Sequence, residues 1–139
     1  MTLRYLLDTS VLSEPLRPRP DPAILELLRI HDSECATASV VWNELWFGCR
    51  RLPDSARRRA IEAYLNRVVA PGIPVLPYDT AAANWHAVER ARLSSLGTPA
   101  PFVDGMIAAI ARTRNLIVVT RNPRDFAAFD GLECVDWGG

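Results

Sequence analysis

Four acidic residues of this 139-residue chain have the type and spacing to build a catalytic site. Asp8 comes directly after a short apolar run, and Asp125 lies a few residues after a second one. Glu44 and Asp104 each interrupt the apolar face of a stretch with helical spacing. An unpaired buried carboxylate is costly, so each of these acids needs a cationic partner, a proton or a metal ion.

Each acid taken alone also has an ordinary structural interpretation. Asp8 suits the N-cap of a helix, because an aspartate side chain accepts hydrogen bonds from the first free backbone N–H groups. Asp104 lies near a predicted helix N-terminus, where a negative charge is favourable. Glu44 could form a surface ion pair with Arg50 or Arg51. These alternatives stay open for each residue considered by itself.

The four acids considered together favour a metal site. Two carboxylates about 4 Å apart repel each other by about 4 kcal/mol at an effective dielectric constant of about 20. A cluster of them therefore requires a divalent cation or raised pKa values. Ligand sets made only of oxygen suit Mg²⁺, with Mn²⁺ as a substitute. His31 and His86 are isolated within helical patterns and are not expected to be ligands.

Strands alternate with helices along the chain. We expect strands at 3–7, 35–39, 73–76, 116–120 and 132–137, and helices at 21–30, 40–52, 55–69, 80–96 and 101–113, with a short helical turn at 123–129. In the helix at 101–113, the residues expected to face the core are Phe102, Met106, Ile107 and Ile110. No loop is long enough to suggest a second domain. Residues 1–139 are therefore predicted to form one α/β domain with a mainly parallel sheet.

The predicted sheet accounts for the position of the polar residues. Ligands of open parallel sheets bind beyond the carboxyl ends of the strands. Asp8 follows the first strand, and Thr120, Arg121 and Asn122 follow the apolar strand that precedes them. We expect these side chains to lie at one edge of the sheet, where the candidate site would form.

Composition excludes several classes of protein. The chain is 49% hydrophobic and 23% charged, which is typical of a soluble globular protein. All 16 cationic residues are arginine, so lysine Schiff bases and P-loops are excluded. No 18-residue apolar run and no secretory signal is present, so no membrane association is expected. Three scattered cysteines without a C-x-x-C pair favour the reducing cytoplasm over a disulfide framework.

Four sequence blocks resemble those of PIN-domain ribonucleases. They are "LLDTSVLSE", "ASVVWNELWFGCRRL", "FVDGMIAAIA" and "LIVVTRNPRDF", and the similarity extends in order from residue 5 to Trp137. More narrowly, they are similar to the VapC-type and FitB-like toxins of bacterial type II toxin–antitoxin pairs. The resemblance implies a five-stranded parallel sheet flanked by helices, with an acidic site that binds Mg²⁺ or Mn²⁺.

The resemblance also implies roles for the acids. Asp8, Glu44 and Asp104 match the first three acids of the family, and Asp8 and Asp104 would hold the metal. The fourth place is occupied by Asn122 where many members have aspartate. Either Asn122 or the nearby Asp125 would fill that role. Glu44 or Asp125 would complete a second ligand set or orient the attacking water.

The neighbouring polar residues would support this chemistry. Ser10 stands where asparagine is common in the family, and Ser10 and Thr120 would contribute hydroxyl groups next to the metal ligands. Arg121 and Arg124 flank the expected site and would contact RNA phosphates.

The resemblance implies a cytoplasmic endoribonuclease toxin with a VapB-type antitoxin as its partner. The toxin would cleave RNA, form a homodimer and contact DNA only through the antitoxin. The alternative is a FitB-like protein without catalysis, whose work is to form a DNA-binding complex with its antitoxin. Trp42 and Trp46, one helical turn apart, would either pack in the core or line a partner interface.

Overall fold

A five-stranded sheet forms the centre of the computed structural model, which describes residues 2–139. The strands are β1 (Tyr5–Leu7), β2 (Cys35–Ala38), β3 (Val75–Leu76), β4 (Ile117–Val119) and β5 (Cys134–Val135). All neighbouring pairs are parallel, in the order β3-β2-β1-β4-β5. The predicted α/β class and five-stranded parallel sheet are confirmed, and each strand is shorter than the sequence pattern indicated.

Strand β1 lies between β2 and β4, and the register aligns their carboxyl ends. Leu7 is opposite Thr37 of β2 and Val119 of β4. Leu6 and Leu7 are fully buried, as are Val118 and Val119, because helices cover both faces of the sheet. The residues that follow β1 and β4 are therefore forced to the same edge.

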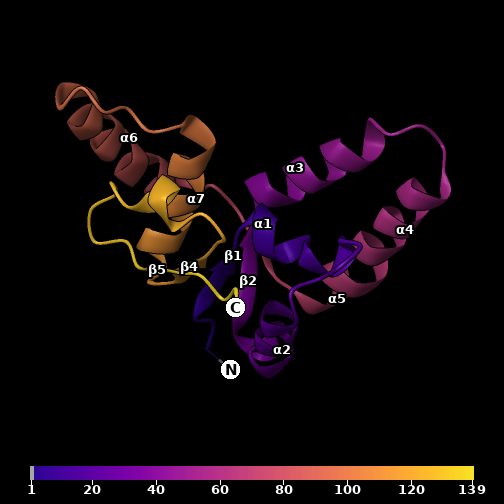
Figure 1. Ribbon diagram of the computed structural model, residues 1–139. Helices are drawn as coiled ribbons and strands as arrows, with labels where there is room; N and C mark the ends of the chain where they lie inside the picture. The colour runs from indigo at the N-terminus through magenta and orange to yellow at the C-terminus, as the bar shows by residue number, and fades with distance from the viewer. Residues whose placement is uncertain (1) are drawn as a thin grey trace.

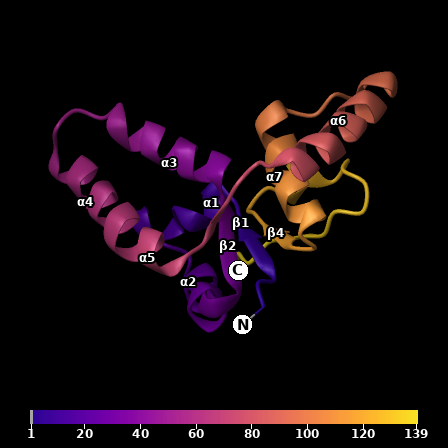
Figure 2. The same cartoon turned by 180° about the vertical axis from the view of Figure 1, so that it is seen from behind.

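Helices connect the strands. They are α1 (Thr9–Leu12), η1 (Glu14–Leu16), α2 (Pro22–Ile30), η2 (Asp32–Glu34), α3 (Ser39–Arg50), α4 (Ala56–Tyr64), the π-helical η3 (Leu65–Val69), α5 (Ala70–Gly72), α6 (Thr80–Ser95), α7 (Phe102–Thr113) and η4 (Pro123–Phe126). Helices α3 and α4 extend to one side of the sheet, while α6 and α7 extend to the other (Figures 1 and 2). Helix α1 lies between the two pairs, directly after β1.

Local sequence sets the main helix boundaries. Asp21 caps α2 by accepting a hydrogen bond from the backbone N–H of Ala23, with Pro22 at the first helical position. Asp79 caps α6 in the same way. Gly97 has a φ angle of 75°, a left-handed conformation that favours glycine and ends α6. These boundaries agree with the sequence predictions, whereas the predicted helix ranges did not include the short helices α1, η1, η2 and α5.

Two expectations about core packing have different outcomes. Ile107 and Ile110 of α7 are buried, but Phe102 is 49% exposed, so its predicted inward orientation is wrong. Phe102 is the first residue of α7, and its ring contacts His86 and lies under the guanidinium group of Arg90, both on α6. Trp42 and Trp46 pack edge-to-face, with ring centroids 6.0 Å apart, against the hydrophobic core. Both side chains are half-buried, so they contact the core and also keep a surface that a partner could cover.

Two further observations concern the cysteines and the helices of residues 2–139. Cys35, Cys49 and Cys134 are all free thiols. Within the same residues, every helix is too short or too polar to cross a lipid bilayer.

Candidate active site

Asp8 caps a helix and also lies at the candidate site, at the carboxyl end of β1. One carboxylate oxygen accepts a hydrogen bond of 2.8 Å from the backbone N–H of Thr9, which makes Asp8 the N-cap of α1. The other oxygen accepts a hydrogen bond of 2.9 Å from the hydroxyl group of Thr120. Thr120 is fully buried, so its hydroxyl group is a fixed donor. The two hydrogen bonds hold the Asp8 carboxylate at the end of β1.

The pairing of β1 with β4 explains why Asp8 and Thr120 meet. The residues before them, Leu7 and Val119, are partners across the two strands. The backbone N–H of Asp8 also donates to the carbonyl oxygen of Val119 over 2.9 Å. Burial raises the pKa of Asp8 above its ordinary value, with a further contribution from the negative charge of Asp125; the hydrogen bonds from Thr120 and Thr9 oppose this rise.

Glu44 reaches the same region from α3. Its carboxylate accepts a hydrogen bond of 3.0 Å from the hydroxyl group of Thr9. Among residues 2–139, no ion pair joins Glu44 to Arg50 or Arg51, so the alternative of a surface ion pair is wrong. The guanidinium groups of those arginines lie over aromatic rings instead. Thr9 is a site residue that sequence reasoning did not single out.

Asp104 lies in the first turn of α7 and is half-buried. Burial raises its pKa from 3.8 to about 6, with additional repulsion from Asp125, Asp8 and Glu44. The four predicted acids, which come from four separate segments of the chain, therefore share one electrostatic environment. Convergence of this kind was the central sequence prediction about the site.

A close helix contact sets the position of Asp104. The next residue, Gly105, packs against the imidazole ring of His86 on α6, and a Cβ atom at that position would overlap the ring. Nδ1 of His86 is 2.8 Å from the hydroxyl group of Tyr78. His86 thus serves the packing of α6 against α7.

The segment after β4 contacts the segment after β1 through its backbone. The backbone N–H of Arg121 donates to the hydroxyl oxygen of Ser10 over 3.1 Å, and that of Asn122 donates to the hydroxyl oxygen of Thr120 over 3.1 Å. Asn122 and Asp125 are both exposed at this edge. Both remain candidates for the fourth position.

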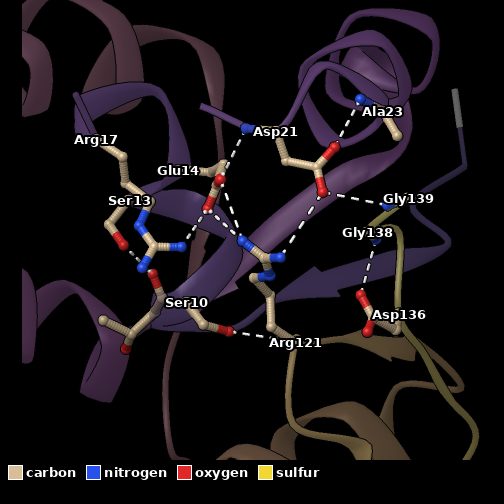
Figure 3. A network of polar contacts seen from close by, with 11 residues as sticks. Ser10, Ser13, Glu14, Arg17, Asp21, Ala23, Arg121, Asp136, Gly138 and Gly139 are labelled. Carbon is tan, nitrogen blue, oxygen red and sulfur yellow. Dashed lines mark hydrogen bonds and ion pairs between the residues drawn. The ribbon is translucent and has the colours of Figure 1, made fainter. Parts of the chain in front are cut away.

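The Arg121 side chain has protein partners. Its Nη1 atom is 3.2 and 3.3 Å from the two carboxylate oxygens of Glu14, and its Nη2 atom is 3.7 Å from Asp21 (Figure 3). The predicted contact of Arg121 with RNA must therefore compete with these ion pairs. Glu14, which is 1% exposed, was not recognised from the sequence, because it lies in a polar, proline-rich stretch that resembles a surface loop.

The chemistry of the four acids fits a hard divalent cation. They offer only oxygen ligands, and among residues 2–139 none of them forms an ion pair with an arginine. As the side chains stand, no three Asp, Glu, His or Cys residues within 2–139 are gathered tightly enough to hold a metal ion. The carboxylates thus share an environment without forming a closed ligand set.

The fold and this acidic edge define a PIN domain. The model of the PIN-domain family matches residues 5–132, and the chain belongs to that family. Its similarity extends to the VapC type. The chain is 35% identical over 136 residues to the tRNA(fMet)-specific endonuclease VapC of Shigella flexneri, covering 97% of this chain and 98% of that protein. It is 32% identical over 130 residues to the toxin FitB of Neisseria gonorrhoeae, covering 90% and 92%.

Solved structures agree with the sequence relatives. The chain superimposes on the DNA-bound VapBC structure from Salmonella typhimurium with a TM-score of 0.85 at 32% identity, over 97% of this chain and 98% of that one. It matches FitAcB from Neisseria gonorrhoeae with a TM-score of 0.85 at 29% identity, over 96% and 97%. The likeness spans essentially the whole chain in both cases.

Proposed function

We propose that the protein is a metal-dependent endoribonuclease that acts as the toxin of a type II toxin–antitoxin pair. The observation that carries this proposal is the group of four acids near the carboxyl end of β1, none of which forms an ion pair with an arginine among residues 2–139. The pKa of Asp104 is raised to about 6 by burial and by the charges of Asp125, Asp8 and Glu44. The names of the VapC relatives support the activity.

In this proposal Asp8 and Asp104 hold Mg²⁺ or Mn²⁺. The bound cation would polarise the scissile phosphodiester and make water a better nucleophile at neutral pH. Thr120 and the backbone N–H of Thr9 keep the Asp8 carboxylate in place. Glu44, which accepts a hydrogen bond from the Thr9 hydroxyl group, or Asp125 would orient the attacking water or complete a second ligand set.

A groove beside the acids suits a phosphodiester substrate. It has a volume of about 470 Å³, and its lining includes Thr9 and Glu44 together with Arg17, Arg51 and Arg57. Within residues 2–139, Arg51 and Arg57 have no carboxylate partner. Arginines of this kind can bind phosphates bidentately. We therefore propose that RNA enters along this groove, with Arg124 as a further phosphate contact beyond the acids.

We further propose a VapB-type antitoxin as the cytoplasmic partner, a homodimer of this chain, and contact with DNA only through the antitoxin. The solved relatives support the antitoxin, since they include FitAB bound to a DNA fragment and DNA-bound VapBC. Exposed apolar side chains on α6, directly after it and on α7, namely Val88, Leu96, Phe102 and Val103, offer surface for a dimer contact. Sedimentation of the purified chain tests the dimer.

The decisive experiment incubates purified, antitoxin-free protein with a mixed RNA pool in Mg²⁺ or in Mn²⁺. Parallel samples contain EDTA or the variant Asp104→Asn. Cleavage that requires both the metal and Asp104 is the expected result. Absence of cleavage by folded protein in either metal would instead favour the FitB-like binding role, which the open arrangement of the acids makes the second candidate.

A further inference from the structure

Glu14 is a buried carboxylate with an unusually complete set of protein partners. Its side chain is 1% exposed. It accepts a hydrogen bond of 2.9 Å from the backbone N–H of Asp21 and contacts Nη1 of Arg17 at 3.4 Å. Arg121 completes the set with one nitrogen close to both carboxylate oxygens. Figure 3 shows the Arg121 guanidinium group between Glu14 and Asp21.

The location of Arg121 links this cluster to the candidate active site. Arg121 directly follows Thr120, whose hydroxyl group donates to Asp8. The backbone N–H of Arg121 donates to Ser10, two residues after Asp8 in sequence. The backbone of residues 120–122 is thus attached to the Asp8 segment, while the side chain of Arg121 is attached to Glu14.

We propose that Glu14 is a positioning residue that acts through Arg121 on the metal site. Glu14 fixes the guanidinium group, Arg121 thereby holds the turn at residues 120–122, and the turn keeps the Thr120 hydroxyl group on Asp8. This inference rests on the proposed metal-dependent function. Groups that orient metal ligands from outside the ligand set typically change metal affinity by about 10- to 100-fold when removed.

Glu89 offers a matched control in the same chain. It is 4% exposed, pairs with Arg92 three residues later, and accepts a hydrogen bond of 2.7 Å from the backbone N–H of Asp130. Glu14 has the same three features with Arg17 and Asp21. The difference is that Arg121, a partner of Glu14, directly follows Thr120 and donates its backbone N–H to Ser10. Within residues 2–139, Glu89 and its partners make no hydrogen bond or ion pair with Asp8, Ser10 or Thr120.

The test measures Mn²⁺ binding by electron paramagnetic resonance of free Mn²⁺, in protein without RNA. The proteins compared are the wild type, Glu14→Gln and Glu89→Gln, each with its fold checked by circular dichroism. We expect Glu14→Gln to raise the dissociation constant for Mn²⁺ about 10-fold. We expect Glu89→Gln to stay within about twofold of the wild type, because the contacts of Glu89 with Arg92 and Asp130 do not include the segments that hold Asp8.

A double variant tests whether the effect passes through Arg121. Glu14→Gln combined with Arg121→Gln replaces the ion pair by two amides, and it carries the test if Glu14→Gln alone does not fold. The double variant should bind Mn²⁺ no more weakly than Glu14→Gln, since both changes break the same link. A much larger loss in the double variant would show that Arg121 acts independently of Glu14, and would overturn the inference.

The remaining outcomes separate the inference from the proposed function. Wild-type affinity in Glu14→Gln would overturn the positioning role and leave the nuclease proposal standing. Equal losses of Mn²⁺ affinity in Glu14→Gln and Glu89→Gln would show that either substitution destabilises the fold in general. That result would also overturn the positioning role of Glu14. No Mn²⁺ binding by the wild type would overturn both, because there would be no metal site to position.

Discussion

Residues 120–122 contact two groups of carboxylates, Asp8 through Thr120 and Glu14 through Arg121, and the two groups differ in what neutralises them. Glu14 is neutralised by the protein, through Arg17 and Arg121. Asp8 and Asp104 have no arginine partner among residues 2–139, and like charges surround them. Arginine therefore pairs with the carboxylate that serves structure, and no arginine pairs with the carboxylates of residues 2–139 that we propose to bind a metal cation.

The pKa values of Asp104 and Glu14 are shifted in opposite directions. Burial raises the pKa of Asp104 to about 6, and the neighbouring acids add to this rise. Burial would also raise the pKa of Glu14, but the backbone N–H of Asp21 and the positive charges of Arg121 and Arg17 more than offset it and leave that pKa below its usual value. Burial alone thus does not identify a functional acid; the partners decide.

Asp104→Asn should have the largest effect of any single change. It removes a proposed metal ligand, so RNA cleavage should fall by at least about 100-fold. The metal-free variant should be at least as stable as the wild type, because a repelling charge is gone. RNA cleavage assays and thermal unfolding in EDTA measure the two effects. A marked loss of stability in EDTA would show that the Asp104 carboxylate stabilises the metal-free fold, as that of Glu14 does.

Arg121→Met should act in the opposite direction on stability. It leaves buried Glu14 with Arg17 as its one arginine partner, so the free energy of unfolding should fall by about 2 kcal/mol. Urea unfolding at neutral pH measures this change. If Arg121→Met were as stable as the wild type, Glu14 would not depend on Arg121 for its neutralisation.

The stability of the metal-free protein should decline as the pH rises from about 4 to about 6. Asp104 has a pKa of about 6 in the folded protein against an ordinary value of 3.8, so the folded state binds more protons in this window. Asp8, whose pKa is also raised, contributes in the same direction. Rising pH then favours the unfolded chain, and Asp104→Asn should make the decline shallower.

Glu14 should contribute the opposite slope at lower pH. Its pKa lies below the ordinary value of 4.5, so its stabilising effect is lost as the pH falls below that value. Urea unfolding of the wild type, of Asp104→Asn and of Glu14→Gln from pH 3 to 7 separates the two slopes. An unchanged profile in Asp104→Asn would show that Asp104 does not titrate in this window.

Arg59→Ala should have the smallest effect. Arg59 pairs with Asp54 on the surface, where both side chains are largely exposed, so water screens the pair and little stability depends on it. We expect a change in the free energy of unfolding below about 0.5 kcal/mol and unaltered RNA cleavage. A change as large as that of Arg121→Met would remove the distinction between buried and exposed pairs.

Residue patterns with local causes were predictable from the sequence. Asp21 and Asp79 begin helices because their side chains satisfy nearby backbone N–H groups, and Gly97 ends one because of its left-handed conformation. The strands follow from apolar runs, and parallel pairing of the strands before Asp8 and Thr120 brings those residues together. Convergence of the acids followed from placing each one at the end of a strand or the start of a helix.

The tertiary structure decided what depends on distant partners. Glu14 and Arg121 are 107 residues apart, and nothing in a proline-rich stretch indicates that its glutamate is buried beneath an arginine from the segment after β4. The orientation of Arg121 towards Glu14, and the exposure of Phe102, likewise depend on how the segments pack. The sequence by itself determined which groups could do chemistry, because strand ends and caps are local. Only the packed fold decided which carboxylates are paired, because ion pairs form between segments that the chain keeps far apart.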